Sequence, residues 1–372
     1  MNKHLQAFME SDEDGVFYIG HASALARINE MLVLFDPVWD WKPYGEYWYF
    51  DPEQINCNEI LPLVDFCVIS HIHEDHVCES ILRRLNSNGC RTFIMSGRPE
   101  LKARLNKYGC VVSEFEPFSP ARRLGLEFTF IPHAFNKVDS SCIVRGRPSG
   151  FAVYHGNDNF LSSELIERVV ALNVKIDVAM VPYAFIHWYP ACMNMPEEEK
   201  LAEIQRLNKQ SLAQAEAFVD AIKPVHTIPF GSNLLHYDNE FLNDNLTNPR
   251  HFVSALPISA GGYILGHKVF MPKTERIDPL RAIALKVQNA GSTVQDHQLV
   301  VNGYVIDMQR LLVYGGDPTG PYTRFDFKPK EFREWIAGKI TFEQAIGTRQ
   351  FTCTRVPNDY RLEVFEWFNK WL

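Results

Sequence analysis

Apolar and polar residues alternate along the chain in the patterns of both strands and helices. Short runs rich in β-branched and aromatic residues are typical of strands, and in the first half of the chain they cover residues 16–22, 31–36, 64–70, 91–95, 126–132 and 151–156. Helical patterns at 78–87 and 99–109 separate some of these runs. Strands that alternate with helices predict an α/β fold in which helices cover a sheet.

The second half repeats this alternation and then changes. Strand-like runs flank a long amphipathic segment, 197–222, which begins after Pro196 with three glutamates and stops before Pro224. These start and stop signals predict one long helix over a sheet. Beyond about residue 275 the pattern becomes more helical and aromatic. We therefore expect a domain over residues 1–274 and a helical C-terminal extension over 275–372 that packs on it as a cap.

Composition and charge narrow the possible partners. The chain has 372 residues, of which 46% are hydrophobic and 22% charged, as in globular proteins. A formal charge of −8 and the lack of a basic run argue against nucleic acid as a partner. An apolar leader and a membrane-length apolar run are both missing from the sequence, so we expect a cytoplasmic protein without membrane association. The eight cysteines form no CxxC pair, which favours neither a disulfide framework nor a zinc ribbon.

The densest group of metal-binding side chains directly follows the buried run 64–70. Along an extended segment His71 and His73 point the same way, and Asp75 and His76 fall in the next turn. Two imidazoles then reach one cation, while a carboxylate and a third imidazole reach another. A polar loop with only local hydrogen bonds is the alternative, but four donors directly after a strand favour a dinuclear metal centre.

These residues, HIHEDH, match the HxHxDH motif of the metallo-β-lactamase superfamily. Residues 18–37 also resemble the opening strands of that superfamily, with Gly20-His21 and with Asp36-Pro37 at the end of the second strand. The resemblance implies an αββα sandwich with a two-metal site along one edge. Because the motif is shared by many chemistries, it implies the fold far more than the reaction.

The same resemblance implies further metal ligands at later strand ends. His133 stands where another histidine is expected, and Asp158 where a metal-bridging aspartate is expected. His226 and His236 both remain candidates for the last histidine, and His236 is favoured because it lies beyond the end of its strand. The implied set is His71, His73 and His133 on one metal, Asp75, His76 and His236 on the other, and Asp158 as the bridge.

Two stretches resemble one branch of the superfamily, the CMP-N-acetylneuraminate hydroxylases and their relatives. They are the turn around Tyr189, Pro190 and Cys192 with the segment from Pro229 to Asn243, and the closing segment from Trp335 to Tyr360. The Rieske domain of those hydroxylases requires Cys-x-His and Cys-x-x-His pairs, which this sequence lacks. The chain thus resembles the metallo-β-lactamase part alone.

The branch implies a metal-dependent enzyme, a non-haem diiron oxygenase that uses O₂ to hydroxylate or N-oxygenate a small molecule. Its electrons would come from a separate reductase or ferredoxin. A dinuclear zinc hydrolase, using a bridging hydroxide on an ester, amide, lactone or phosphoester, is the alternative, and a non-catalytic metal-dependent sensor is a third. Histidine and aspartate ligands suit Zn, Fe or Mn and leave the metal open, and the resemblance to this branch is what favours Fe. The substrate and the oligomeric state stay open.

Other side chains near predicted strand ends are candidates for catalysis or substrate binding. His21 and His155 flank strands near the expected site, and the stretch from His187 through Trp188 to Tyr189 follows the strand-like run 175–183. The aromatic loop 36–52 offers an apolar pocket wall, although packing within its own domain is an equal alternative. The expected catalytic residues are His21, His155, His187 and Tyr189, and the expected substrate-binding residues are Trp39, Trp41, Trp188 and Asn239.

Overall fold

The chain divides into two compact units, Met1–Pro272 and Lys273–Leu372, each described here by itself. The structure is a computed structural model. It describes residues 2–40, 43–44, 48–50, 53–134, 136–185, 189–231, 234–236, 243, 245, 252–256, 258–271, 279–290, 294–348, 350–359 and 361–368. In this part of the chain no helix combines the length and the apolar character that crossing a bilayer requires.

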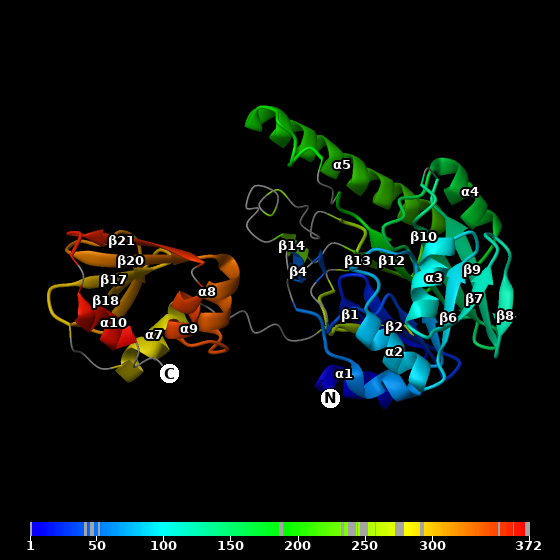
Figure 1. The fold of residues 1–372 in the computed structure, drawn as a ribbon, viewed down its shortest axis with the longest axis horizontal. Coiled ribbons are helices and arrows are strands. Elements are labelled where there is room, and N and C mark those ends of the chain that lie inside the picture. Colours follow the sequence, from blue (N-terminus) through cyan, green and yellow to red (C-terminus); the bar gives the residue numbers. More distant parts are fainter. Residues whose placement is uncertain are drawn as a thin grey trace. The chain divides into compact units, whose positions relative to one another are not determined.

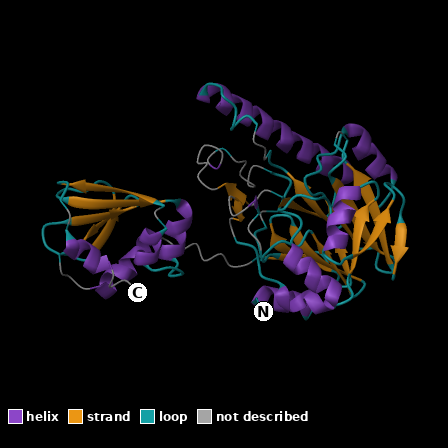
Figure 2. Ribbon diagram, in the orientation of Figure 1, coloured by secondary structure: helices purple, strands orange, loops and turns teal. Residues whose placement is uncertain are grey.

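Two large sheets form the framework of the first unit (Figures 1 and 2). The larger sheet contains β1 (Gly15–Gly20), β2 (Ser23–Ile28), β3 (Met31–Phe35), β5 (Phe66–Val68), β6 (Arg91–Met95), β7 (Val111–Phe115), β15 (Tyr263–Leu265) and β16 (Lys268–Phe270). The smaller sheet contains β8 (Ala121–Arg123), β9 (Leu126–Pro132), β10 (Ser140–Gly146), β11 (Ala152–His155), β12 (Val178–Pro182) and β13 (His226–Phe230). Their strand orders are β16-β15-β1-β2-β3-β5-β6-β7 and β13-β12-β11-β10-β9-β8.

The two sheets pack face to face because their strands are apolar on both sides. In β1, Val16 belongs to a buried cluster shared with the smaller sheet, while the next residue, Phe17, belongs to a cluster on the opposite face. Strands covered on both faces need such continuous apolar runs. The inner cluster joins Val33 of the larger sheet to Phe128 and Val153 of the smaller one. It is the central core of the unit.

Helices cover the two outer faces. The outer face of the larger sheet packs on α1 (Lys3–Met9), α2 (Glu79–Ser87) and α3 (Pro99–Lys107), and that of the smaller sheet on α4 (Ser163–Ala171) and α5 (Glu197–Ile222). In Figure 1, α4 and α5 lie on the side of the sandwich away from α1 and α2. The predicted αββα sandwich is confirmed. So is the long helix, which ends where Lys223 adopts a left-handed φ of 48°.

The second unit is a mixed α/β structure and corrects the expectation of a helical extension. Its helices are α7 (Pro279–Ala290), α8 (Pro329–Ile336), α9 (Phe342–Gly347) and α10 (Leu362–Phe368). It also contains a sheet of order β19-β18-β17-β20-β21, built from β17 (Gln298–Val301), β18 (Tyr304–Asp307), β19 (Leu312–Gly315), β20 (Tyr322–Phe327) and β21 (Phe351–Val356). These strands are only four to six residues long, so the longer helical periods next to them dominate the sequence pattern.

Candidate metal centre

The candidate site lies at one edge of the sandwich, where several strands of both sheets end. His21 follows β1, Asp36 follows β3, residues 71–76 follow β5, and Asp158 follows β11. β3 and β5 are parallel neighbours, so their carboxyl ends meet at the same edge. His21 and Asp36 both have left-handed backbones, with φ of 44° and 38°. Such conformations are uncommon outside glycine and are tolerated best by Asn, Asp and His.

Asp36 is a fully buried carboxylate that orients the histidines around it. It accepts hydrogen bonds from the Ser70 backbone N–H at 2.8 Å, the Ser70 hydroxyl at 2.5 Å and His76 Nδ1 at 2.9 Å. Burial raises its pKa, but the bond and charge of His76, with the Ser70 hydroxyl, outweigh this and hold the pKa below its usual value. An ionised carboxylate only accepts. His76 therefore carries a proton on Nδ1.

Ser70 holds His71 in the same tautomer as His76, with the proton on Nδ1. The single hydroxyl proton of Ser70 goes to Asp36, so its oxygen accepts from His71 Nδ1, 3.0 Å away. The Asn157 side-chain amide lies 3.1 Å from the same ring nitrogen, and it accepts from the Nδ1 proton when its oxygen, which has no other partner among the described residues, is turned toward the ring. Burial is the main cause that lowers the pKa of His71 to about 3, which leaves Nε2 with a free electron pair. This Nε2 lies 2.7 Å from His73 Nδ1.

The Nε2 atom of His76 faces two carboxylates. It lies 3.3 Å from Asp75 Oδ2 and 3.4 Å from Asp158 Oδ2, and it is buried without a hydrogen-bond partner among the described residues. Burial lowers the pKa of His76, but Asp75 and Asp158 raise it further than burial lowers it. Buried polar groups in proteins are normally paired. A cation between this nitrogen and the carboxylates would satisfy all three groups.

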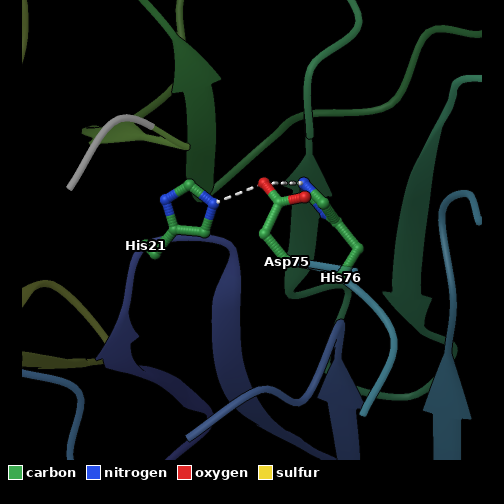
Figure 3. Close-up of side chains that lie close together, drawn as sticks. All are labelled: His21, Asp75 and His76. Carbon is green, nitrogen blue, oxygen red and sulfur yellow. Dashed lines mark hydrogen bonds and ion pairs between the residues drawn. The ribbon is translucent and has the colours of Figure 1, made fainter. Parts of the chain in front are cut away.

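Asp75 lies between His76 and His21 (Figure 3). Its Oδ2 is 3.1 Å from His21 Nε2, and its Oδ1 is 3.4 Å from the hydroxyl of Tyr44. Burial raises the pKa of Asp75, yet the neighbouring histidines, His76 first, hold it well below its usual range. The Nδ1 atom of His21 is buried and has no partner within the described structure. Asp75 is thus an ionised carboxylate held between two imidazoles.

Three sets of donor atoms in the described residues are close enough to hold a metal ion. They are His21, Asp75 and His76; His71, His76 and Asp158; and His71, His73 and Asp139. The Nδ1 atoms of His71 and His76 already form hydrogen bonds to Ser70 and Asp36. Each ring therefore has only Nε2 available and can bind one cation. The sets therefore resolve into two cation positions. Asp158 Oδ2 lies 3.8 Å from one Nε2 and 3.4 Å from the other, between the two positions, and the donors fit a pair of divalent cations.

The end of β13 approaches this site closely. Gly231 has a left-handed φ of 77°, and a Cβ added there would lie 3.3 Å from Asp158 Oδ1. Its N–H donates to the carbonyl of His21. Since the site lies at this end of β13, His226 at the first position of the strand is remote from it. His236 is the last residue of β14 (Leu234–His236), which pairs with β4 (Trp48–Phe50), and its side chain lies outside the described structure.

His133 does not join any of the described donor sets. It is half-buried, and its Nδ1 accepts a hydrogen bond from the backbone N–H of Asn136 at 3.1 Å. Asp139, which the sequence reasoning missed, takes part in the set with His71 and His73 instead. Asp139 stands just before β10 rather than after a strand, so the expectation of ligands at strand ends could not find it.

The remaining predicted residues have other surroundings. His155 stacks on Phe35 with ring centres 4.7 Å apart and donates from Nε2 to the carbonyl of Ala22 at 3.2 Å. Tyr189 donates to Glu203 of α5 at 3.1 Å. Trp39 packs against the outer core of the larger sheet, and its indole N–H donates to Asn58. The other four predicted positions lie outside the described residues: Trp41, His187, Trp188 and Asn239.

Comparison with known proteins gives distant similarities. No family model matches the chain. A curated relative from Mycolicibacterium smegmatis, named as a Rieske 2Fe-2S iron-sulfur protein, is 25% identical over 251 residues, which are 62% of this chain and 46% of the relative. The chain thus spans about half the length of the curated relative it matches.

Among solved structures, the chain is similar to Igni18, a metallo hydrolase of Ignicoccus hospitalis, with 19% identity, a TM-score of 0.46, and 68% of this chain and 97% of that chain covered. It is similar to CmlA, a diiron β-hydroxylase of Streptomyces venezuelae, with 17% identity, a TM-score of 0.45, and 59% and 45% covered. YhfI of Bacillus subtilis, a metallo-β-lactamase fold protein, gives 11% identity, a TM-score of 0.38, and 59% and 86% covered. Identities this low say nothing of the reaction.

Proposed function

We propose that the first unit is a dinuclear metal enzyme, and specifically a non-haem diiron oxygenase that hydroxylates or N-oxygenates a small molecule. One observation carries the proposal of two metals. The Nε2 atoms of His71 and His76 lie 3.8 and 3.4 Å from one carboxylate oxygen of Asp158. Two imidazoles of fixed tautomer on either side of one carboxylate are suited to two cations, with Asp158 as the bridge.

The residues of this chain prepare the site before any cation binds. Asp36 and Ser70 hold the two imidazoles in the tautomers that expose Nε2, and both residues are buried. When bound, the metal pair supplies electrons to O₂ if it is iron, or Lewis-acid activation of water if it is zinc. His21 and the Tyr44 hydroxyl contact the outer side of Asp75, where they can hold or pass a proton next to the centre.

The sequence resemblance supports iron, and the donor chemistry is compatible with it. The described donor sets contain only imidazole and carboxylate groups, which suit iron and manganese as well as zinc, whereas a thiolate would favour zinc. The branch that the sequence resembles consists of oxygenases, and the curated relative is named for a redox cluster. We propose a separate reductase or ferredoxin as the electron donor.

Metal analysis of anaerobically purified protein, followed by exposure to O₂, tests the proposal. We expect two irons per chain and a transient change in visible absorption on adding O₂ to the reduced protein. His76→Ala should lose iron and the response, while His267→Ala, at an exposed histidine outside the described donor sets, should keep both. Two zincs and no response to O₂ would contradict the oxygenase and support a zinc hydrolase. A chain that binds no metal would contradict both.

A further inference from the structure

We propose that Asp139, and not His133, completes the ligand set of the cation held by His71 and His73. The inference rests on the dinuclear centre proposed above and identifies one of its ligands. Apart from the shared Asp158, it makes the first position a site of two imidazoles and one carboxylate, where the superfamily resemblance implied three imidazoles.

Asp139 places one carboxylate oxygen in the site. Asp139 is only 7% exposed, and its Oδ1 lies 3.7 Å from His71 Nε2. This oxygen is buried and has no hydrogen-bond partner among the described groups. A buried carboxylate oxygen without a partner is costly. A cation shared with His71 and His73 removes that cost, because the donor atoms of the three residues all lie within 4.8 Å of one another.

The turn before β10 fixes the direction of this carboxylate. The Asn136 side-chain amide donates to Asp139 Oδ2 at 2.8 Å, and the Asn136 side-chain oxygen accepts from the Asp139 N–H at 2.9 Å. The Asp139 carbonyl accepts from the backbone N–H of His133 at 3.3 Å and from Arg98 at 3.2 Å. With Oδ2 and both backbone groups held, Oδ1 is the atom left to face His71.

The same turn also forms a hydrogen bond to the ring of His133. Its Nδ1 accepts the backbone N–H of Asn136 at 3.1 Å. In the neutral ring the proton is then on Nε2, so neither nitrogen has an electron pair available for a cation in this tautomer. The His133 ring is half-buried, whereas Asp139 is buried beside the donors. The Asn136 backbone N–H thus donates to the histidine, and the Asn136 side chain forms hydrogen bonds with the aspartate. Both contacts favour Asp139 over His133 as the ligand.

A carboxylate in this position changes which metals the site prefers. Two histidines and one carboxylate with open positions form the arrangement typical of non-haem Fe(II) sites. A third imidazole would suit zinc and copper better than a hard carboxylate oxygen does. Asp139 therefore biases the first position toward Fe(II) or Mn(II), and it does so independently of what the second position holds.

Anaerobic titration with Co(II), followed by its visible absorption and by metal analysis, tests the assignment without any assay of activity. We expect wild type to bind two ions. Asp139→Asn should keep one and bind the other more than about 100-fold more weakly, since even residues behind a ligand affect affinity about 10–100-fold. His133→Ala should keep both ions and an unchanged spectrum. Asp139→Glu, which retains a carboxylate, should keep two ions with an altered spectrum.

Loss of an ion in His133→Ala, or two tightly bound ions in Asp139→Asn, would overturn the assignment while leaving the dinuclear centre intact. Failure of the wild-type chain to bind any Co(II), Fe(II) or Zn(II) would overturn the proposed function and this inference together. Thermal unfolding in a chelator shows whether Asp139→Asn folds. If it does not, the result for His133→Ala alone decides between the two residues.

Discussion

A single carboxylate that is not among the described metal-donor sets organises the candidate centre. Asp36 is completely buried and accepts three hydrogen bonds, two from Ser70 and one from His76. Through these it decides which nitrogen of each neighbouring imidazole carries a proton. Groups behind a ligand usually matter nearly as much as the ligand itself. Asp36 should therefore affect metal binding although it is not itself a donor in the described sets.

Asp36→Asn should weaken metal binding about 10–100-fold. The substitution replaces one accepting oxygen by an amide that donates, so the Ser70 and His76 donors no longer all find acceptors. Asp40→Asn is the matched control, because Asp40 pairs with Arg84 at the half-exposed surface instead. Competition with a metal-sensitive dye measures both affinities. Equal affinities in the two variants would show that Asp36 does not orient the ligands.

We expect His155 to make stability depend on pH. It is fully buried, and burial lowers its pKa despite the opposing charge of Asp36. Between its ordinary value, about 6.5, and its lowered native value, the unfolded chain binds a proton that the native chain does not. The free energy of unfolding should therefore fall as pH decreases below about 6.5.

His155→Phe, which keeps a ring between Phe35 and Phe230, should remove this part of the pH dependence. Urea unfolding in a chelator between neutral and mildly acidic pH measures the slope for each chain. Because His71 and His76 also titrate differently in the two states, the comparison uses the difference between wild type and variant. Identical slopes would contradict the assignment.

Helix ends in the second unit show how local sequence signals stabilise an element. Thr341 is the N-cap residue just before α9. Its hydroxyl accepts the Gln344 N–H at 3.1 Å, and the Gln344 side chain accepts the Thr341 N–H at 2.8 Å. Each contact satisfies a backbone donor that the helix itself leaves unpaired. The helix then buries Phe342 and Ala345 in the core of the unit.

Thr341→Ala should lower the free energy of unfolding of the second unit by about 1 kcal/mol, because the Gln344 backbone N–H loses the hydroxyl that accepts it. Thr341→Ser keeps the hydroxyl and is expected to lose much less. Chemical denaturation followed by circular dichroism measures the difference. If alanine and serine had equal effects, the loss would come from the methyl group and not from capping.

Other elements show where local patterns suffice and where they fail. The bounds of α5 follow from Pro196, its acidic first turn and Pro224, all of which act within a few residues of the helix end. β20 alternates half-buried residues with the buried Thr323, Phe325 and Phe327. Its strand period is clear only once the helices that cover one face of the sheet are known.

At the level of the whole chain, each unit has its own core. The buried side chains of the second unit, including Trp335 and Trp367, cluster with one another, and the first unit has separate clusters between and outside its sheets. A domain of about 100 residues with its own core is large enough to fold alone.

Residues 273–372 expressed alone should therefore unfold cooperatively, and residues 1–272 alone should bind as many metal ions as the full chain. Thermal unfolding and metal analysis of the two fragments measure these outcomes. A second-unit fragment without a cooperative transition, or a first-unit fragment with fewer ions, would show that the units depend on each other. The donor sets described above all lie within the first unit.

Patterns that act between near neighbours could be read directly from the chain. The strand and helix periods predicted an α/β fold, and the signals around Pro196 and Pro224 predicted the long helix. The HIHEDH motif implied the sandwich through its resemblance to the superfamily, and its spacing brought His71, His73, Asp75 and His76 into one hypothesis. Contacts between distant residues could not be read in this way. Asp36 meets Ser70 across 34 positions and His21 meets Asp75 across 54. Which side chain of the 133–139 turn faces the donors depends on how Asn136 divides its hydrogen bonds, and spacing alone carries no information about that division.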